Sequence, residues 1–408
     1  MLMIFKNQIS NKSFFYYVLG DIISGFGSGM TLIGLNWFIL EKSNSSLSVA
    51  YFMILQLISG IVFSPFIGGL VDFLKRKDVL IISNFIRALA IILICIIYSL
   101  YSNYYILFIL AIVNGAGWTT YVTSSRALTQ EILNETELRV GNSFIEISMQ
   151  VGLFLASGAS GIIYSYIGII GILAIDAATF IISNVFLYQI KVNEEININN
   201  EESYLDKIKI GKQYAIDNPL IFFFGVSIFI PFVVTMASNV ILPEYVMNYL
   251  NSNSVVFGIS DMLYGVGACL AGVIIVNSKL KKNLKVVPIY VYNIISIVAL
   301  VFLYSNKIVY SLYIAYLVFG LGNTSLRILL NGYIMAVVPK KHFGYSMAIW
   351  LAISNAMQAI VVLSIGWGIN LISANYGYLI LALIMVIVLA ILFYFFERNK
   401  RNDINLKV

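Results

Sequence analysis

The chain alternates long apolar runs with short polar stretches. Each run holds about 20 or more mostly apolar residues, the length that an α-helix needs to cross the hydrocarbon core of a bilayer. Several runs exceed this minimum, which predicts tilted helices or helix ends that protrude into the interface. The pattern predicts an all-α membrane protein with 12 transmembrane helices, near residues 14–40, 47–70, 79–101, 105–125, 142–165, 168–188, 219–243, 254–276, 286–304, 308–330, 345–368 and 376–396.

Basic residues are distributed very unevenly between the two sides of these predicted spans. If the spans alternate across the membrane, 21 of the 25 lysines and arginines fall on one side. The other side has only Lys42 and Lys307, and the last two, Arg87 and Arg327, lie within spans. Because cytoplasmic loops carry the excess of Lys and Arg, the sequence predicts that both termini are cytoplasmic. Removing one helix from the count would destroy the asymmetry.

A polar stretch at about 189–218 separates six predicted spans from six others. We therefore predict three parts: an N-terminal six-helix bundle at 1–190, a cytoplasmic linker at 191–218 and a C-terminal six-helix bundle at 219–408. The composition of the linker favours a solvated tether, and a short amphipathic helix at Tyr204–Tyr214 is the alternative. Its polar residues include Glu194, Glu195, Asn199, Asn200, Glu201, Glu202 and Lys207.

The two predicted bundles share a weak internal repeat. The loop between the second and third spans reads Gly-Gly-Leu-Val-Asp-Phe-Leu-Lys-Arg-Lys from Gly68 to Lys77. A shift of 205 residues, about half of the chain, brings this loop onto a second basic loop, which lacks the acid. The matched pairs are Asp72 with Asn277, Arg76 with Lys281, and Lys77 with Lys282.

The same shift aligns two glycine-containing segments. Gly-Ala-Gly-Trp-Thr-Thr at 115–120 in the fourth span matches Gly-Leu-Gly-Asn-Thr-Ser at 320–325 in the tenth. Small residues at this spacing favour close helix approach in lipid, where packing drives association. Two six-span halves of equal topology predict bundles related by an axis along the membrane normal, as in two-bundle transporters. A substrate path between the bundles is the hypothesis that follows.

Composition supports the membrane interpretation and excludes several kinds of chemistry. The hydrophobic fraction is 60%, and 11% of residues are charged, whereas soluble domains are near half apolar and a quarter charged. The two cysteines, Cys95 and Cys269, and the single His342 offer neither a disulfide framework nor a metal site. The chain also lacks the phosphate-binding glycine loop that precedes a Lys-Ser/Thr pair. We therefore expect no enzyme, no cofactor and no ATP-driven transport by this chain alone.

The net charge of +6 does not indicate nucleic acid, because the basic residues flank membrane segments. The expected partner is the lipid bilayer, and the expected state is a monomer. A small amphipathic substrate as a further partner, and a proton gradient as the energy source, are expected from the family resemblance that follows.

With these features, the chain resembles a major facilitator superfamily transporter over essentially its whole length. The loop between the second and third spans of that superfamily has the form Gly-x-x-x-Asp-Arg-x-Gly-Arg-Arg/Lys. Four positions fit and two depart, since Phe73 replaces the first Arg and Lys75 the second Gly. The resemblance implies that this loop gates transport. Asp72 would contact the facing bundle and so favour the outward-open state of the transporter. The four residues that fit are Gly68, Asp72, Arg76 and Lys77.

Further segments resemble the macrolide-efflux-like branch of drug exporters within that superfamily. They are Gly-Phe-Gly at 25–27, the acidic loop at 130–138 and Ala-Ile-Asp at 174–176. Two departures weaken the expectation of a standard proton antiporter. The Arg that such exporters carry before the Gly-x-Gly of span four is missing from 111–114, and the Gly-Pro pair of span five is missing from 152–161.

Six ionisable residues lie within predicted spans, where each is costly and is therefore a functional candidate. The resemblance implies that spans one, four, seven and ten line a central cavity. Asp21 in span one could exchange the coupling proton or contact a cationic substrate, or serve as a packing acid bound to Ser or Thr. Arg327 in span ten could pair with Asp21 across the cavity or hold an anionic group. Both are therefore candidates for proton coupling or substrate binding.

Two further candidates for these roles lie closer to the ends of spans. Glu146 enters span five near the cytoplasmic face, where an interfacial role is the alternative. Asp261 in span eight could instead make a hydrogen bond at a bundle contact, for example to Tyr264. Arg87 and Asp176 lie on spans three and six, so we interpret them as structural intramembrane charges inside the N-terminal bundle.

Aromatic side chains supply candidates for the cavity wall. Trp118 and Tyr121 in span four and Phe229 in span seven could line a hydrophobic cavity suited to bulky amphipathic ligands. The alternative for each is packing or contact with lipid. Pro231 interrupts span seven and predicts a bend.

Together these features predict a bacterial plasma-membrane secondary transporter, a proton-coupled exporter of a lipophilic or amphipathic small molecule of the macrolide or multidrug type. The bundles would alternate access by rocking, with protonation of Asp21 or Glu146 biasing the states. One alternative is a lipid or lysophospholipid flippase of the same fold, without an obligatory proton step. Another is a membrane immunity or sensor protein that transports nothing.

Overall fold

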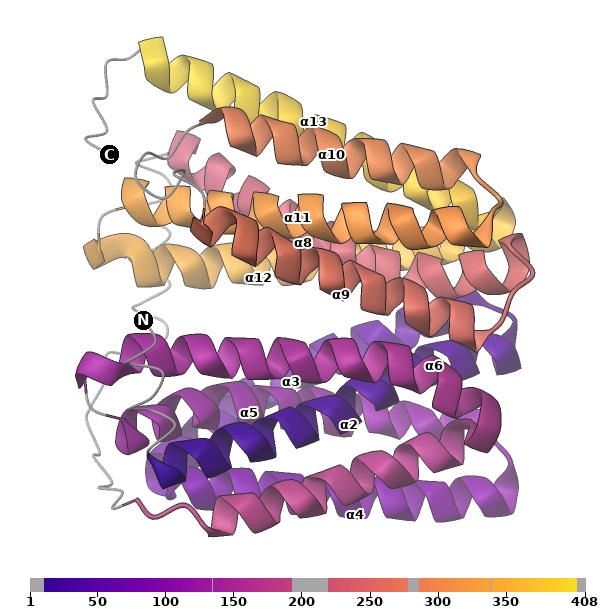
Figure 1. Cartoon of the computed structure of the whole chain (residues 1–408), viewed down its shortest axis with the longest axis vertical. Helices are drawn as coiled ribbons and strands as arrows, with labels where there is room; N and C mark the ends of the chain where they lie inside the picture. Colours follow the sequence, from indigo (N-terminus) through magenta and orange to yellow (C-terminus); the bar gives the residue numbers. More distant parts are fainter. Residues whose placement is uncertain (1–10, 134, 193–218, 278–285, 339, 402–408) are drawn as a thin grey trace. The chain divides into compact units, whose positions relative to one another are not determined.

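The computed structural model describes residues 11–133, 135–192, 219–277, 286–338 and 340–401, and all regular structure in these ranges is helical. The helices of the first half are α2 (Lys12–Ser43), α3 (Ser46–Phe73), α4 (Arg76–Tyr101), the short η1 (Tyr104–Leu107), α5 (Phe108–Ile132) and α6 (Glu135–Tyr188). Those of the second half are α8 (Pro219–Glu244), the π-helical turn η2 (Tyr245–Tyr249), α9 (Ser254–Asn277), α10 (Val286–Ser305), α11 (Val309–Val337), α12 (Lys340–Leu371) and α13 (Ala374–Arg401) (Figure 1).

The chain divides into two compact units. Unit 1 comprises Met1–Asn44 and Ser48–Asn199, and unit 2 comprises Ser45–Leu47 and Asn200–Val408. Most of the predicted linker, residues 193–218, lies outside the described residues.

Eleven helical segments among the described residues are long and apolar enough to cross a membrane. The sequence predicts 12, and the difference arises at α6, where Val151–Tyr188 counts as a single segment. Gly168 interrupts this helix with φ 64° and ψ −167°, a conformation that favours glycine. The break falls between the predicted spans 142–165 and 168–188. The full count of 12 and the cytoplasmic position of both termini stay predictions.

The two arms of α6 lie along α2 in opposite directions, so the chain turns back at Gly168 (Figure 1). In the first arm, Gly152 lies against Phe26, and the Ser160 hydroxyl donates to the carbonyl of Met30 at 3.0 Å. In the second arm the order is reversed. Gly20 lies against Ser183 and Gly34 against Ile172. Glycines on α2 and α6 thus allow one central helix to contact both arms.

Several helix ends in unit 1 are capped as local sequence predicts. Asn11 precedes α2, and its side-chain oxygen accepts a hydrogen bond from the Phe14 N–H at 3.2 Å. Asn44 ends the same helix in the left-handed conformation, with φ 49°, and its N–H donates to the Leu40 carbonyl. Asparagine is favoured at both kinds of cap, because its side chain replaces lost helix bonds and tolerates positive φ.

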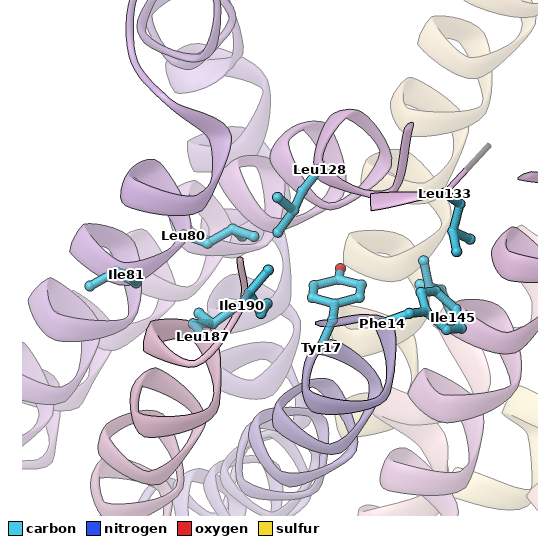
Figure 2. Packing of buried hydrophobic residues seen from close by; sticks show 9 residues of the cluster. All are labelled: Phe14, Tyr17, Leu80, Ile81, Leu128, Leu133, Ile145, Leu187 and Ile190. Carbon is cyan, nitrogen blue, oxygen red and sulfur yellow. The ribbon is translucent and has the colours of Figure 1, made fainter. Parts of the chain in front are cut away.

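At one end of unit 1, an apolar cluster joins four helices. Its members come from α2, α4, α5 and the two arms of α6, with Ile190 just beyond the end of α6. Figure 2 shows the Tyr17 ring within this cluster, between the side chains of α5 and the end of α6. Burying these side chains fixes the helix ends around Tyr17. The cluster consists of Phe14, Tyr17, Leu80, Ile81, Leu128, Leu133, Ile145, Leu187 and Ile190.

Unit 2 is built around α8, which packs against α11, α12 and α13. Phe224 of α8 stacks on Phe395 of α13 with ring centroids 4.1 Å apart. The indole N–H of Trp350 on α12 donates to the Phe222 carbonyl at 3.1 Å. Gly225 makes room for this indole ring, since an added Cβ would collide with it. Aromatic packing therefore fixes one end of α8 in the unit.

The glycine repeat predicted from the sequence corresponds to close helix approach in both units. A Cβ at Gly115 of α5 would meet the Gln56 carbonyl oxygen of α3. A Cβ at Gly320 of α11 would meet the Tyr264 carbonyl oxygen of α9. Two residues further along, Gly117 faces α4, and Gly322 faces α10. The expectation of close packing at these glycines is confirmed.

Candidate functional site

Asp21 lies inside unit 1, where aromatic hydroxyl groups surround it. Its side chain, on α2, is only 6% exposed. Tyr17, one turn earlier on α2, and Tyr121 of α5 both interact electrostatically with its carboxylate. The Tyr121 hydroxyl makes no hydrogen bond of standard geometry, so this contact is close but not optimal. A buried acid beside two tyrosines can exchange a proton or hold a cation.

Tyr17 connects the acid to the apolar cluster at the end of the unit. Its hydroxyl donates a 2.5 Å hydrogen bond to the Ser125 side chain of α5. Its ring lies among the residues shown in Figure 2 and is only 2% exposed. Sequence reasoning did not identify Tyr17 or Ser125, because a tyrosine in an apolar run gives no signal of a buried polar contact.

The predicted aromatic pair on α5 forms a surface beside this acid. The rings of Trp118 and Tyr121 lie 5.6 Å apart with 34° between their planes. Tyr121 is half-buried, whereas Trp118 is 46% exposed. Tyr121 also interacts with the Asp21 carboxylate, so the apolar face formed by the two rings lies close to this acid. A ligand that carries both a cationic and an apolar part could use both features.

A second polar centre of unit 1 contains the predicted structural charges. Asp176, on the second arm of α6, is fully buried, and Arg87 of α4 is 8% exposed. The Thr31 hydroxyl of α2 donates to the Asp176 carboxylate at 2.6 Å. The Arg87 guanidinium donates to Ser28 at 3.2 Å and to Asn114 at 3.4 Å, and it lies over the Phe180 ring. These residues therefore lie in the interior of unit 1, on helices other than those expected to line the cavity.

In unit 2, Arg327 of α11 lies half-buried against an aromatic ring. Its guanidinium carbon is 4.9 Å from the centroid of Phe232 on α8. This cation–π contact holds the Arg327 side chain against α8. Phe229, the predicted cavity aromatic, is half-buried three residues earlier on the same helix.

Asn323 of α11 forms a buried polar contact at the proline of α8. Its side-chain NH₂ group lies 3.1 Å from the Pro231 carbonyl oxygen, 2.8 Å from the Thr235 hydroxyl and 3.1 Å from the Tyr264 hydroxyl. Its side-chain oxygen is buried and has no hydrogen-bond partner among the described residues. The amide group thus joins α8, α9 and α11 at Pro231. Periodicity alone gave no indication that these residues meet.

Asp261 of α9 is half-buried, and its charge acts on Tyr316 of α11. Tyr316 is hydrogen-bonded to Ser238 at 2.9 Å and to Tyr378 at 2.6 Å, both in the buried interior. The alternative suggested for Asp261 was a bond to Tyr264. That hydroxyl contacts Thr235 and Asn323. The hydrogen-bonded hydroxyls of Ser238, Tyr316 and Tyr378 were not predicted from the sequence.

The predicted gating loop is described only in part. Gly68 and Asp72 lie near the end of α3, in a stretch whose side-chain surroundings fall outside the described structure. The same holds for Glu146 of α6. Arg76 is the first residue of α4. Lys77 donates from its ammonium to the carbonyls of Tyr188 and Ile190, at 3.2 and 2.8 Å.

The Lys77 contact places a positive charge at the C-terminal end of α6, where the helix dipole favours a cation. Lys77 therefore has a structural contact within unit 1 in addition to the gating role expected from the resemblance. That gating role stays a prediction.

The described residues contain no cluster of three or more His, Cys, Asp or Glu side chains that could hold a metal ion. Among the described residues, Asp21 and Asp176 of unit 1 face hydroxyl groups, aromatic rings and an arginine.

The family follows from a comparison over nearly the whole sequence. The family model of the Major Facilitator Superfamily matches residues 17–331 and 224–407. The chain belongs to the major facilitator superfamily. The family and fold are those of membrane transporters, as the resemblance in the sequence predicted. In this superfamily member, glycines allow close helix packing in both halves of the chain.

Two bacterial relatives share about a fifth of the aligned residues with this transporter. It is 19% identical to macrolide efflux protein A of Streptococcus pyogenes over 260 residues, which is 63% of this chain and 64% of that protein. The match thus spans slightly less than two thirds of the length of that relative. An uncharacterized MFS-type transporter, YvqJ of Bacillus subtilis (strain 168), is also 19% identical, over 68% of this chain and 67% of its own.

Solved transporter structures share the fold. A point mutant of the nucleoside transporter NupG has a TM-score of 0.77 at 14% identity and covers 94% of this chain and 100% of its own. A bacterial homologue of the iron transporter ferroportin, in an inward-facing state, has a TM-score of 0.73 at 13% identity, over 94% of this chain and 98% of its own. At such identities the likeness establishes the fold and leaves the substrate open.

Proposed function

We propose that this superfamily transporter exports lipophilic or amphipathic small molecules from bacteria, in exchange for protons, by alternating access. The observation that carries the proposal is the buried Asp21 with its tyrosine partners next to the exposed Trp118. A buried carboxylate in a membrane helix is costly and calls for a function. An adjacent aromatic face matches a substrate that has a large apolar part.

One relative supports the direction and the substrate class, since macrolide efflux protein A is named for the efflux of macrolides. The nucleoside transporter and the bacterial ferroportin homologue among the structural neighbours share only the fold, at 13–14% identity. We therefore propose a macrolide-like substrate with a basic amine, which Asp21 would hold by charge.

The experiment is transport by the purified full chain in proteoliposomes with an imposed proton gradient. The test substrates are erythromycin as a cationic macrolide, a neutral steroid and a fluorescent lysophospholipid. We expect gradient-dependent movement of erythromycin. Lysophospholipid movement without a gradient would favour the flippase alternative instead. Absence of all flux from correctly folded protein would overturn the transporter proposal.

Asp21→Asn tests the proposed role of the acid. The change removes the charge and keeps the size of the side chain, so expression and folding should persist. We expect coupled erythromycin export to fall by about a hundredfold, the order of effect seen when a proton-transfer or charge-stabilising group is lost. Asp78→Asn, at an exposed position in the first turn of α4, is the matched control and should transport normally. Undiminished export by the Asp21 variant would remove this residue from the mechanism.

A further inference from the structure

The Arg87–Asp176 centre of unit 1 has features that packing alone does not explain. Both side chains are buried within membrane-spanning helices, where each charge costs several kcal/mol of free energy. A chain that needed only packing would gain stability from two apolar residues of similar volume. In addition, the acid and the base interact electrostatically and make no hydrogen bond to each other among the described contacts.

The first helix connects the two charges. Ser28 of α2 accepts from the Arg87 guanidinium at 3.2 Å, and Thr31 donates to the Asp176 carboxylate at 2.6 Å. These two residues are three apart, so they lie on neighbouring parts of one helix face. The contacts of α2 with both charged groups therefore depend on whether Asp176 is ionised. Loss of that negative charge would leave Arg87 without its nearest opposite charge.

Two glycines create the space that this centre occupies. A Cβ at Gly27 of α2 would collide with Thr179 and with the carboxylate of Asp176. A Cβ at Gly117 of α5 would collide with the Arg87 side chain. Thr179 also donates to the carbonyl of Asp176 at 2.7 Å and contacts its carboxylate at 3.5 Å. Glycines on two helices, α2 and α5, thus leave room for an acid and a base at this depth.

The charged groups that face Asp176 are few. Helix α4 contributes Arg87, the charged residue that interacts with the carboxylate. Helix α2 faces it with Gly27 and Thr31, which are uncharged, and α5 reaches the same centre through Asn114. A change in the charge of this acid is therefore felt mainly by Arg87.

A polar stripe on α2 leads from Asp21 to this centre. Asp21, Ser24, Ser28 and Thr31 are spaced so that they share one face of the helix. Ser24 and Ser28 are half-buried, whereas Asp21 and Thr31 are buried. Ten residues of helix span about 15 Å. The stripe offers hydroxyl groups between the proposed substrate acid and the buried carboxylate.

From this arrangement we propose that Asp176 is the residue that carries the coupling proton, with Arg87 as its fixed countercharge and α2 as the helix that responds. The inference rests on the proposed function and divides the work between the two acids: Asp21 holds the substrate, and Asp176 holds the proton. The proposal also places a basic side chain beside α5, the fourth predicted span, where the sequence lacks the expected Arg. Arg87 extends from α4 to Asn114 and Gly117 of α5.

The proton step is simple and balanced. A proton from water on one side forms an O–H bond with a carboxylate oxygen of Asp176, which becomes neutral. The same O–H bond breaks in the other state of the transporter, and the proton passes to water on the opposite side. No electron is transferred and no co-reactant is needed. Neutralising Asp176 weakens the charge-assisted hydrogen bond from Thr31, so α2 senses the charge of the centre.

A spectroscopic experiment tests the proton site without any substrate. Infrared difference spectra of the full-length protein in lipid are recorded as the pH is lowered, and the carbonyl band of protonated carboxyl groups is followed. We expect Asp176→Asn to lose one component of that band and Asp78→Asn to retain it. A spectrum that Asp176→Asn leaves unchanged would overturn the assignment.

A transport experiment separates coupling from folding. Proteoliposomes are assayed with labelled erythromycin in two ways: accumulation driven by a proton gradient, and exchange across the membrane without a gradient. We expect Asp176→Asn to lose gradient-driven accumulation by about a hundredfold and to retain exchange. Asp21→Asn should lose both, because it is proposed to hold the substrate.

The double variant Arg87→Gln with Asp176→Asn removes both buried charges and avoids an unpaired one, so it keeps the test valid if the single variant does not fold. A purely structural pair predicts that this variant, once folded, remains coupled to the gradient, and that result would overturn the inference. Uncoupled exchange would support it. If wild-type protein moves no erythromycin, the proposed function fails, while the infrared band still decides where the proton binds.

Discussion

At the scale of single residues, unit 1 separates two acids by their surroundings. Asp21 lies beside tyrosines and near an exposed tryptophan, whereas Asp176 lies among threonines and an arginine in the fully buried interior. The sequence identified both residues as intramembrane charges and assigned Asp176 a structural role. Their different partners come from residues far apart in the chain, so these contacts could not be predicted from the sequence.

The hydrogen bond from Thr31 to Asp176 should contribute measurably to stability. Thr31→Val keeps the shape of the side chain and removes the 2.6 Å bond to a buried carboxylate. We expect the free energy of unfolding to fall by about 1–2 kcal/mol, because a buried acceptor loses a donor. The measurement is thermal or denaturant unfolding of the detergent-solubilised chain.

Thr123→Val is the matched control for this prediction. The Thr123 hydroxyl is exposed and donates within its own helix, to the Thr119 carbonyl at 2.9 Å. Its loss should leave the unfolding transition almost unchanged. Equal effects of the two substitutions would contradict the importance of the Asp176 contact.

At the scale of helices, the structure explains why particular glycines occur in both halves. Gly115 and Gly320 each lie against a backbone carbonyl of the second helix of their unit. In lipid there is little hydrophobic driving force between helices, so close backbone approach and packing must supply the association. The turn at Gly168 is a different use of glycine, because its positive φ lets α6 reverse and place two arms on α2.

Adding one methyl group at these approach points should be costly in both units. Gly115→Ala and Gly320→Ala would each press a Cβ against a backbone oxygen, which cannot move without its helix. We expect each to reduce the free energy of unfolding by about 1–3 kcal/mol, the usual cost of overpacking. Unfolding and the yield of folded protein after solubilisation are the measurements.

Gly25→Ala and Gly272→Ala are the controls, because a Cβ at either position meets nothing within 4 Å. They make the same chemical change in α2 and α9, where it should be neutral or slightly stabilising, since Ala favours helix over Gly. Destabilisation by the controls as large as that by Gly115→Ala would show that the packing explanation is wrong.

At the scale of the whole molecule, the chain consists of two helical units that carry the same glycine arrangement with different polar interiors. Unit 1 buries an acid–base centre, and unit 2 buries a group of hydroxyls and an asparagine around Pro231. If the two halves descend from one repeat, their packing glycines were kept while their chemistry diverged. The proposed proton step is accordingly placed in unit 1, which contains the Arg87–Asp176 centre.

The distribution of basic residues predicts the orientation of the molecule. With 12 spans both termini lie on the cytoplasmic side, whereas 11 spans would place them on opposite sides of the membrane. Reporter fusions to each end, active only in the cytoplasm or only outside, distinguish these two cases. We expect both cytoplasmic reporters to be active. Opposite results at the two ends would mean that α6 crosses the membrane only once.

The sequence by itself determined the helical class, the approximate bounds of the helices and the superfamily, because apolar length, charge asymmetry and the loop at Gly68–Lys77 are local features of the chain. It also identified the glycines of close approach, since small residues in apolar runs signal packing. Only the tertiary structure decided which polar groups meet. The contacts Tyr17–Ser125, Thr31–Asp176 and Arg87–Asn114 each join residues on different helices that are at least 27 positions apart in the chain. A hydroxyl in an apolar run looks the same whether it faces lipid or a buried charge, so its partner is set by the folding of the chain.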